Sequence, residues 1–156
     1  QLSELNGQLP DLRQAGTATQ QFADTAAEVR RIARPGSAVL IISDFKGALE
    51  PRAMEHLHQL SRHTEITALH CSDPLEQHLP GQGRYRVTDG NLKVDLNTGD
   101  AAVRAAFSQR FSESLAGLQD NFTKLGIPLL QLSTSVPALD ALLPYFSTLR
   151  RGAPTA

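Results

Sequence analysis

The chain has 156 residues, of which 40% are hydrophobic and 20% charged, the balance of a globular domain rather than of a disordered or fibrous chain. Its net charge of −1, with both signs interspersed, excludes the basic footprint that nucleic acids and anionic membranes attract. A single cysteine excludes an internal disulfide framework, and no apolar run reaches the roughly 18 residues of a membrane span. We therefore expect a cytoplasmic segment without nucleic-acid or membrane contacts.

The first part of the chain carries little pattern. Residues 1–16 hold scattered leucines interrupted by glycine and proline, and we expect a loop or a frayed helix there. The chain opens on Gln1 rather than methionine, inside ordinary helix-like sequence. Residues 1–156 are therefore expected to form a single domain cut from a longer protein, and an upstream membrane anchor would lie outside this sequence.

A helix and then a buried strand are predicted next. Apolar residues recur at helical spacing from Ala18 to Ala33, and Pro35-Gly36 ends the pattern. The following run, 38–43, has five apolar residues in succession before it ends in Ser43-Asp44. A short apolar run between chain breakers is typical of a strand buried on both faces, as in a parallel sheet.

The same alternation then repeats. A helix is expected to begin at Pro51 and end near His63, and a second strand, 66–71, closes with Ser72-Asp73. Asp100 is expected to cap a long helix that carries one apolar stripe, and 128–132 reads as a third parallel strand. The stripe comprises Val103, Phe107, Phe111, Leu115, Leu118, Phe122 and Leu125. A last helix, from about Val136 to Leu149, contains Pro144.

An insertion interrupts this rhythm between the second and third strands. Polar and apolar residues alternate over 84–96 on either side of Asp89-Gly90. Alternation around an Asp-Gly turn predicts an antiparallel β-hairpin.

These elements predict an α/β fold in three layers, with a parallel sheet of three sequential strands and helices on both faces. Right-handed crossovers place both crossover helices on one face, which leaves the first and last helices for the other face. Strand 38–43 then lies at the edge of the sheet although it is the most apolar strand, and such an edge invites pairing. We expect it to pair with missing upstream strands or with a second copy of the chain.

Two motifs resemble a bacterial family. The run 34–45, Arg-Pro-Gly followed by an apolar strand and Ser-Asp-Phe, resembles the von Willebrand factor A-like proteins often encoded beside MoxR-type AAA+ ATPases, the family called domain of unknown function fifty-eight. The second match is Ser-Asp-Pro-Leu-Glu at 72–76, followed by Leu79-Pro80, Gly83 and Asp89. Together the two motifs place residues 17–134 within the resemblance.

The resemblance implies a doubly wound, Rossmann-like fold with central strand order 3-2-1-4-5-6, of which this chain would hold only the last three strands. It also implies a metal-ion-dependent adhesion site, of which only the aspartate after the fourth strand matches here, as Asp44. No Asp-x-Ser-x-Ser loop occurs in the sequence, so the site would be incomplete in this chain. We expect no cofactor in the fragment, and Mg²⁺ or Ca²⁺ in the intact protein.

The residues themselves allow two interpretations of this edge. Asp44 and Asp73 end neighbouring predicted strands, and with Ser43 and Ser72 they offer oxygen ligands for a hard cation. Alternatively, the same side chains cap the helices that follow or bond loop amides, and without the first metal loop this second interpretation is favoured. Asp44, Ser43 and Asp73 are thus the candidate metal ligands, and no catalytic residue is assigned.

Three functions from different classes remain open at this point. The first is a non-enzymatic protein-interaction module, which the resemblance describes as an adaptor partner of MoxR-type AAA+ ATPases. The second is a metal-dependent hydrolase or phosphotransferase that uses Asp44 and Asp73, which would require a perturbed base or nucleophile in a neighbouring pocket. The third is a structural fragment that forms a homodimer through strand 38–43.

Overall fold

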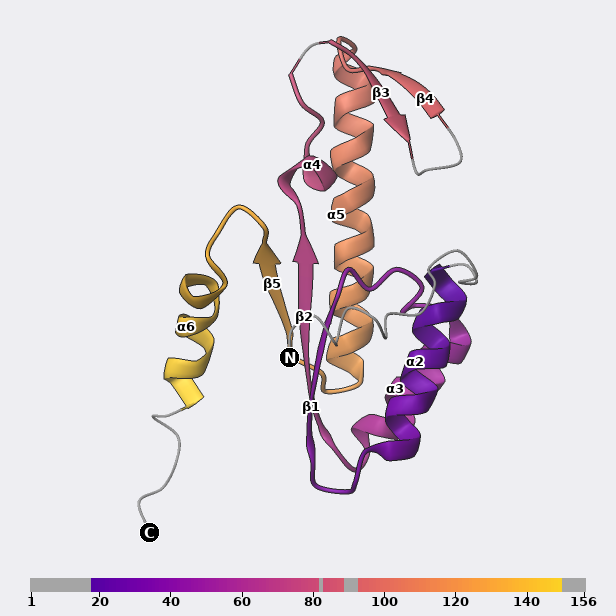
Figure 1. The fold of residues 1–156 in the computed structure, drawn as a ribbon, viewed down its shortest axis with the longest axis vertical. Coiled ribbons are helices and arrows are strands. Elements are labelled where there is room, and N and C mark those ends of the chain that lie inside the picture. The colour runs from indigo at the N-terminus through magenta and orange to yellow at the C-terminus, as the bar shows by residue number, and fades with distance from the viewer. Residues whose placement is uncertain (1–17, 82, 89–92, 150–156) are drawn as a thin grey trace, which may run out of the picture.

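A computed structural model describes residues 18–81, 83–88 and 93–149 of the chain. The expected loop or frayed helix at 1–16 and the Asp89-Gly90 turn lie outside these residues. The described elements are α2 (Ala18–Ile32), β1 (Ala38–Ser43), α3 (Pro51–Ser61), β2 (Glu65–Ser72), α4 (Pro74–Gln77), β3 (Arg84–Thr88), β4 (Lys93–Asn97), α5 (Ala101–Lys124), β5 (Leu129–Ser133) and α6 (Ala138–Leu149) (Figure 1).

Strands β1, β2 and β5 form a parallel sheet in the order β1-β2-β5, as predicted. The register pairs Ile42 with Leu69, and Leu69 with Leu130. Among the described strands, β1 is therefore an edge strand. Because parallel strands share a direction, the carboxyl ends of β1 and β2 lie at the same edge of the sheet, and we call this edge the rim.

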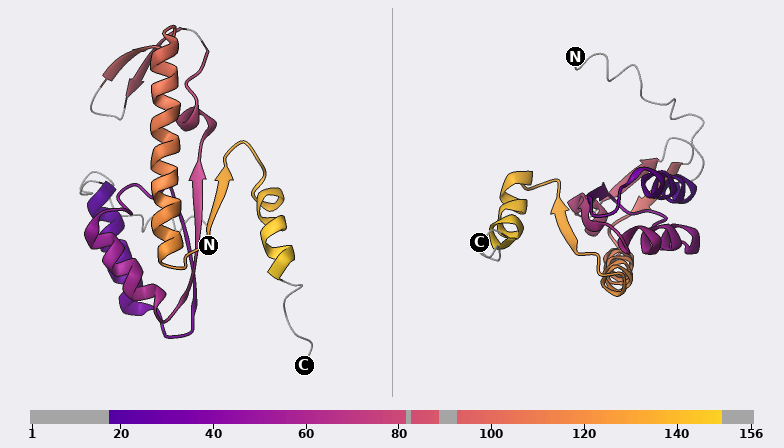
Figure 2. Two further views of the ribbon diagram at one scale, coloured as in Figure 1. Left: turned by 180° about the vertical axis from the view of Figure 1, so that it is seen from behind. Right: turned by 90° about the horizontal axis from the view of Figure 1, so that it is seen from below.

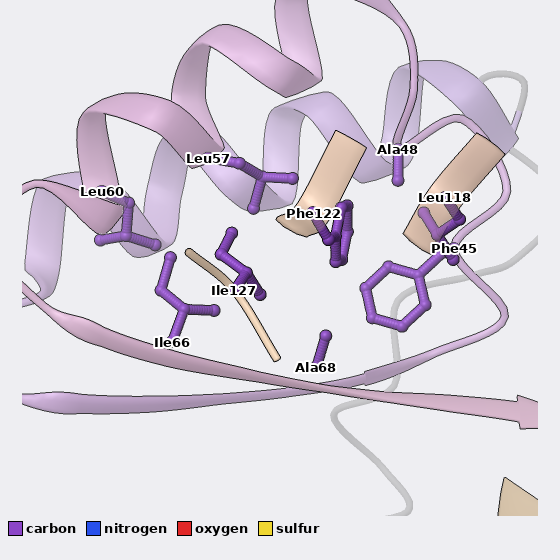
Figure 3. Packing of buried hydrophobic residues seen from close by; sticks show 9 residues of the cluster. All are labelled: Phe45, Ala48, Leu57, Leu60, Ile66, Ala68, Leu118, Phe122 and Ile127. Atoms are coloured by element: carbon purple, nitrogen blue, oxygen red, sulfur yellow. The ribbon is translucent and has the colours of Figure 1, made fainter. Parts of the chain in front are cut away.

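The hydrophobic core lies between one face of the sheet and the helices α2, α3 and α5. Phe122 of α5 and Leu57 of α3 are fully buried there, and Phe45 meets Phe122 edge-on with ring centroids 5.3 Å apart. Burying a side chain of this size stabilises a fold by about 1.5–3 kcal/mol. The cluster in Figure 3 comprises Phe45, Ala48, Leu57, Leu60, Ile66, Ala68, Leu118, Phe122 and Ile127.

The predicted position of the first helix was wrong. Helix α2 packs against α3, and its residues Phe22, Val29 and Ala33 contact the same core cluster as α3 and α5. Figure 2 shows α2 and α3 side by side, with α6 beside β5 and away from α2, α3 and α5. The handedness rule could not place α2, because the connection from α2 to β1 does not join two parallel strands. Of the described helices, only α6 is left for the far face.

The far face of β1 is open to solvent among the described residues. Val39, Ile41 and Ser43 point toward the core side and are half-buried, whereas Ala38, Leu40 and Ile42 alternate with them and are exposed. The exposed fractions of Leu40 and Ile42 are 52% and 63%. The prediction that this apolar strand is an edge is confirmed. The prediction that it is buried on both faces was wrong, because among the described residues no layer covers the face that carries Leu40 and Ile42.

The hairpin and the first half of α5 project beyond the rim (Figure 1). Strands β3 and β4 pair antiparallel as predicted, and the buried Thr98 anchors them by donating its hydroxyl to the Gly81 carbonyl at 2.8 Å. Within the predicted apolar stripe of α5, only Leu118 and Phe122 are fully buried. The remainder of the stripe is less buried because much of it extends past the end of the sheet.

Candidate functional site

A sharp turn at the end of β1 sets the geometry of the rim. The Phe45 backbone has φ of 56°, which is rare for a residue other than glycine and costs on the order of 1–3 kcal/mol. Burial of the Phe45 ring offsets this strain, since its side chain is 5% exposed. The turn is held by the Phe45 N–H, which donates to Ser43 Oγ at 2.9 Å, and by the Lys46 N–H, which donates to Asp44 Oδ1 at 3.1 Å.

Because the chain reverses at Phe45, the Lys46 ammonium comes to lie over the rim carboxylates. Lys46 Nζ is 3.0 Å from Asp44 Oδ2 and 3.9 Å from Glu76 Oε1. Burial raises the pKa of Asp44, but the hydrogen bonds and charge of Lys46 outweigh it, so the net pKa lies below its ordinary value. The bond to Asp44 raises the pKa of Lys46 in turn. Asp44 is therefore an ionised carboxylate that already faces a cation.

Asp73 lies at the same edge of the sheet, but its carboxylate accepts hydrogen bonds instead of pairing with a cation. It caps α4: its Oδ1 accepts a hydrogen bond from the Leu75 N–H at 2.9 Å, while Glu76 Oε2 accepts one from the Asp73 N–H at 3.2 Å. Its other oxygen accepts the Thr134 hydroxyl at 2.6 Å, which ties the end of β2 to the end of β5. The Thr134 and Leu75 bonds lower the pKa of Asp73. The interpretation of Asp73 as a helix cap is thus confirmed. No pattern in the sequence predicted its hydrogen bond with Thr134.

His70 is the rim residue that sequence reasoning missed. It lies on β2 between the rings of Phe45 and Phe111, each with its centroid 6.2 Å away, and only 8% of the residue is exposed. Burial lowers the pKa of His70, although Asp44 and Glu76 act in the opposite direction. Its Nδ1 is buried and has no hydrogen-bond partner. A histidine that follows the apolar residues Ala68 and Leu69 of a strand gave only a weak sign of this environment.

A small cavity of about 50 Å³ lies beside this histidine and is also lined by residues of α5. Its polar lining comes from Asp44, His70 and Ser114, and its apolar lining from Phe45, Leu49, Phe111, Leu115 and Leu118. Since the Asp44 side chain is 45% exposed, the carboxylate is reached from solvent as well as from the cavity.

The rim offers some oxygen ligands for a cation. Asp44 and Ser43 present hard oxygens, and Ser43 Oγ is 3.5 Å from Asp44 Oδ1. Both Asp73 carboxylate oxygens already accept hydrogen bonds. The Lys46 ammonium already forms an ion pair with Asp44, and its positive charge would repel a metal ion bound there. Within the described residues, no group of three histidine, cysteine, aspartate or glutamate side chains could hold a metal. The residues present do not fit a metal ion by themselves.

These features define an α/β protein with a parallel sheet whose charged rim follows the two strands β1 and β2. Residues 3–116 match the family model described as "Protein of unknown function DUF58", and the chain belongs to this family. The matched region includes both motifs that carried the resemblance. In the part of the chain that the structure describes, no helix has the length and apolarity needed to cross a membrane.

The relatives found by sequence are named as uncharacterized proteins. The chain is 29% identical over 126 residues to the uncharacterized protein Rv1480 of Mycobacterium tuberculosis and to the uncharacterized protein Mb1516 of Mycobacterium bovis. Each match covers 80% of this chain and 39% of the relative, so the chain spans well under half the length of these relatives. No solved structure matches the chain.

Proposed function

We propose that this chain is the C-terminal half of a von Willebrand factor A-like domain and serves as a non-enzymatic protein-interaction module. Its partner is a MoxR-type AAA+ ATPase, for which the whole protein acts as an adaptor. The docking site is the rim, with Asp44 and Ser43 as the part of an incomplete metal-ion-dependent adhesion site that this chain contributes. In the intact protein, further oxygen ligands would complete a site for Mg²⁺ or Ca²⁺.

The observation that carries this proposal is that the negatively charged Asp44 carboxylate is held in a fixed position and is partly exposed to solvent. The strained turn at Phe45 is anchored in the core, so the carboxylate is held at a defined place while almost half of its side chain faces solvent. A fixed, exposed charge at the carboxyl end of a parallel sheet is suited to selecting a partner by charge complementarity. Asp73 supports the rim rather than pairing with Asp44 for catalysis, because Thr134 and α4 occupy both of its oxygens.

Direct binding tests the proposal. The full-length protein and this 156-residue chain are immobilised, and association of a MoxR-type ATPase from the same organism is followed by biolayer interferometry, with Mg²⁺ or with EDTA. Asp44→Asn keeps the acceptor for the Lys46 N–H but removes the charge, and we expect it to weaken binding about tenfold or more. Asp140→Asn, on α6, serves as the matched control and should change binding less than twofold.

Two outcomes would contradict the proposal. If the full-length protein does not bind the ATPase, the adaptor role is wrong. If Asp44→Asn and Asp140→Asn bind alike, the rim is not the docking site.

A second candidate function rests on the open edge of β1. Leu40 and Ile42 are exposed on a strand that has one described neighbour, and an edge of this kind pairs readily with another strand. We propose that this chain, taken alone, forms a homodimer through strand 38–43. Light scattering should give twice the chain mass, and Ile42→Lys should return the monomer; a monomeric wild-type chain would refute this candidate.

A further inference from the structure

A second charged surface lies at the opposite end of the sheet from the rim. Helices α2 and α3 lie side by side, and both end there, next to the amino ends of β1 and β2 (Figure 1). The Gly36 N–H donates to the His63 carbonyl at 2.7 Å, which joins the chain after α2 to the chain after α3. Two segments that are distant in sequence thereby bring four arginines to one end of the molecule: Arg30, Arg31, Arg34 and Arg62.

A groove of about 480 Å³ lies between the two helices at this end. The residues that line it are Ala27, Glu28, Arg30, Arg31, Gln59 and His63. Sites for bound molecules commonly enclose about 300–1,000 Å³, so this groove has room for a side chain and the backbone beside it.

The fold orients Arg30 in this groove through a neutral partner. The Arg30 guanidinium donates from Nη1 to Gln59 Oε1, and Gln59 Nε2 donates to Glu55 Oε1 at 3.1 Å, which turns the amide oxygen toward the arginine. Because the Gln59 amide carries no charge, this bond fixes the guanidinium without neutralising it. A guanidinium has five donors in a planar fork, and the donors that remain can bond both oxygens of a carboxylate.

The end of α2 and α3 stays positive when its own negative charges are considered. Glu28 forms an ion pair with Arg31 at 2.7 Å, whereas in the described part of the chain no hydrogen bond or ion pair engages the side chains of Arg34 and Arg62. Glu65 begins β2 nearby, but strand residues alternate, so it faces the side of the sheet away from these helices. The carboxyl ends of two helices add only about half a negative charge each.

We propose that this groove binds an acidic segment of another protein, with Arg30 bonding one of its carboxylates and Arg34 and Arg62 as further cationic contacts. A carboxylate supplies the charge that Gln59 lacks and matches the fork of the guanidinium. Four arginines do not form the long basic stripe that nucleic acids require. The groove is separate from the rim, so this inference does not depend on the proposed adaptor role.

A hexaglutamate peptide with blocked ends is the probe, and a hexaglutamine peptide of equal length is the neutral reference. The isotopically labelled chain is titrated with each peptide while its NMR spectrum is recorded. We expect saturable shifts with hexaglutamate at the side-chain signals of Arg30 and Gln59 and at the backbone of His63. The affinity should fall as sodium chloride is raised, because salt screens exposed charges.

Matched variants locate the binding. Arg30→Gln should weaken hexaglutamate binding about three- to tenfold, the range for a charged hydrogen bond at a partly exposed site. Arg30→Lys should weaken it less, because it keeps the charge and loses the fork. Arg110→Gln, at an exposed position of α5, should leave binding unchanged. Thermal melts of all three variants show whether the fold is retained.

Three outcomes would overturn the inference. The first is the absence of saturable shifts with hexaglutamate, or equal shifts with hexaglutamine. The second is equal hexaglutamate affinity of Arg30→Gln and Arg110→Gln. The third is tighter binding of inorganic phosphate or of a short oligothymidylate than of hexaglutamate, which would assign the groove to phosphate groups instead of an acidic segment.

Discussion

The described core predicts that Phe122→Ala is among the most destabilising single changes in the chain. Phe122 is fully buried in α5 at the centre of the cluster, where it meets the Phe45 ring edge-on at 5.3 Å. Truncating a buried phenylalanine to alanine costs about 3–5 kcal/mol, because transfer free energy is lost and a cavity remains. Domains of this size are stable by only about 5–15 kcal/mol, so the variant loses a large share of its stability.

The expected shift is measurable by two methods. With about 2–4 °C per kcal/mol for a domain of this size, the melting temperature should fall by roughly 6–20 °C. Urea unfolding followed by circular dichroism should show the same loss of free energy. A double-mutant cycle with Phe45→Leu should give a coupling of about 0.5–1.5 kcal/mol, as expected for an edge-on aromatic pair.

Leu139→Ala is the matched control, because Leu139 of α6 is a large apolar residue that is 69% exposed. Its effect should stay within about 0.5 kcal/mol. If the two variants lose similar stability, the core does not lie between the sheet and α2, α3 and α5. An uncoupled cycle would show that the Phe45 and Phe122 rings are not in contact.

Three further predictions concern the hairpin, the start of α5 and the rim. Thr98→Val should lower the free energy of unfolding by about 1–3 kcal/mol and reduce amide protection in the hairpin, since the hydroxyl bond to Gly81 is lost; unchanged protection would contradict the anchor. Asp100→Ala should cost about 0.5–2 kcal/mol and fray the start of α5, whereas Asp100→Asn should cost less, as urea unfolding would reveal. Burial lowers the pKa of His70, so the free energy of unfolding is highest above the ordinary pKa of 6.5 and falls as the pH drops below that value. The free energy of unfolding of His70→Gln should therefore depend less on pH. Equal pH dependence of the two proteins would refute this prediction.

Much of the fold was predictable because its signals are local. The apolar run at 38–43 lies between chain breakers, polar and apolar residues alternate in the two segments that form β3 and β4, and Asp100 precedes a periodic apolar stripe. Each pattern reflects backbone preferences that a few neighbouring residues decide. Strand order followed from these elements and the right-handedness of crossovers. The positions of Asp44 and Asp73 at one edge followed as well.

The errors have a common physical cause, since they depend on contacts between distant segments. Helix α2 was assigned to the far face by elimination, but its apolar stripe finds the core of α3 and α5. The apolar stripe of α5 indicated one apolar side of this helix, yet most of the stripe is not fully buried, because the hairpin insertion and the start of α5 lie beyond the sheet. A helical wheel records which side of a helix is apolar but not how far the neighbouring layer extends.

The sequence by itself determined most of the described elements, the order of the parallel strands and the carboxylate that follows β1, whereas the short helix α4 was not predicted. Only the tertiary structure decided what surrounds that carboxylate. The hydrogen bond from Thr134 to Asp73 joins residues that are 61 positions apart in the sequence. His70 of β2 and Phe111 of α5 are also distant in sequence, yet their rings are in contact and line the same cavity. The Lys46 contact with Asp44 is local in sequence, but the left-handed turn that creates it is held by burial of Phe45 in the shared core. Burial of this kind is a property of the packed layers and leaves no pattern in the neighbouring residues.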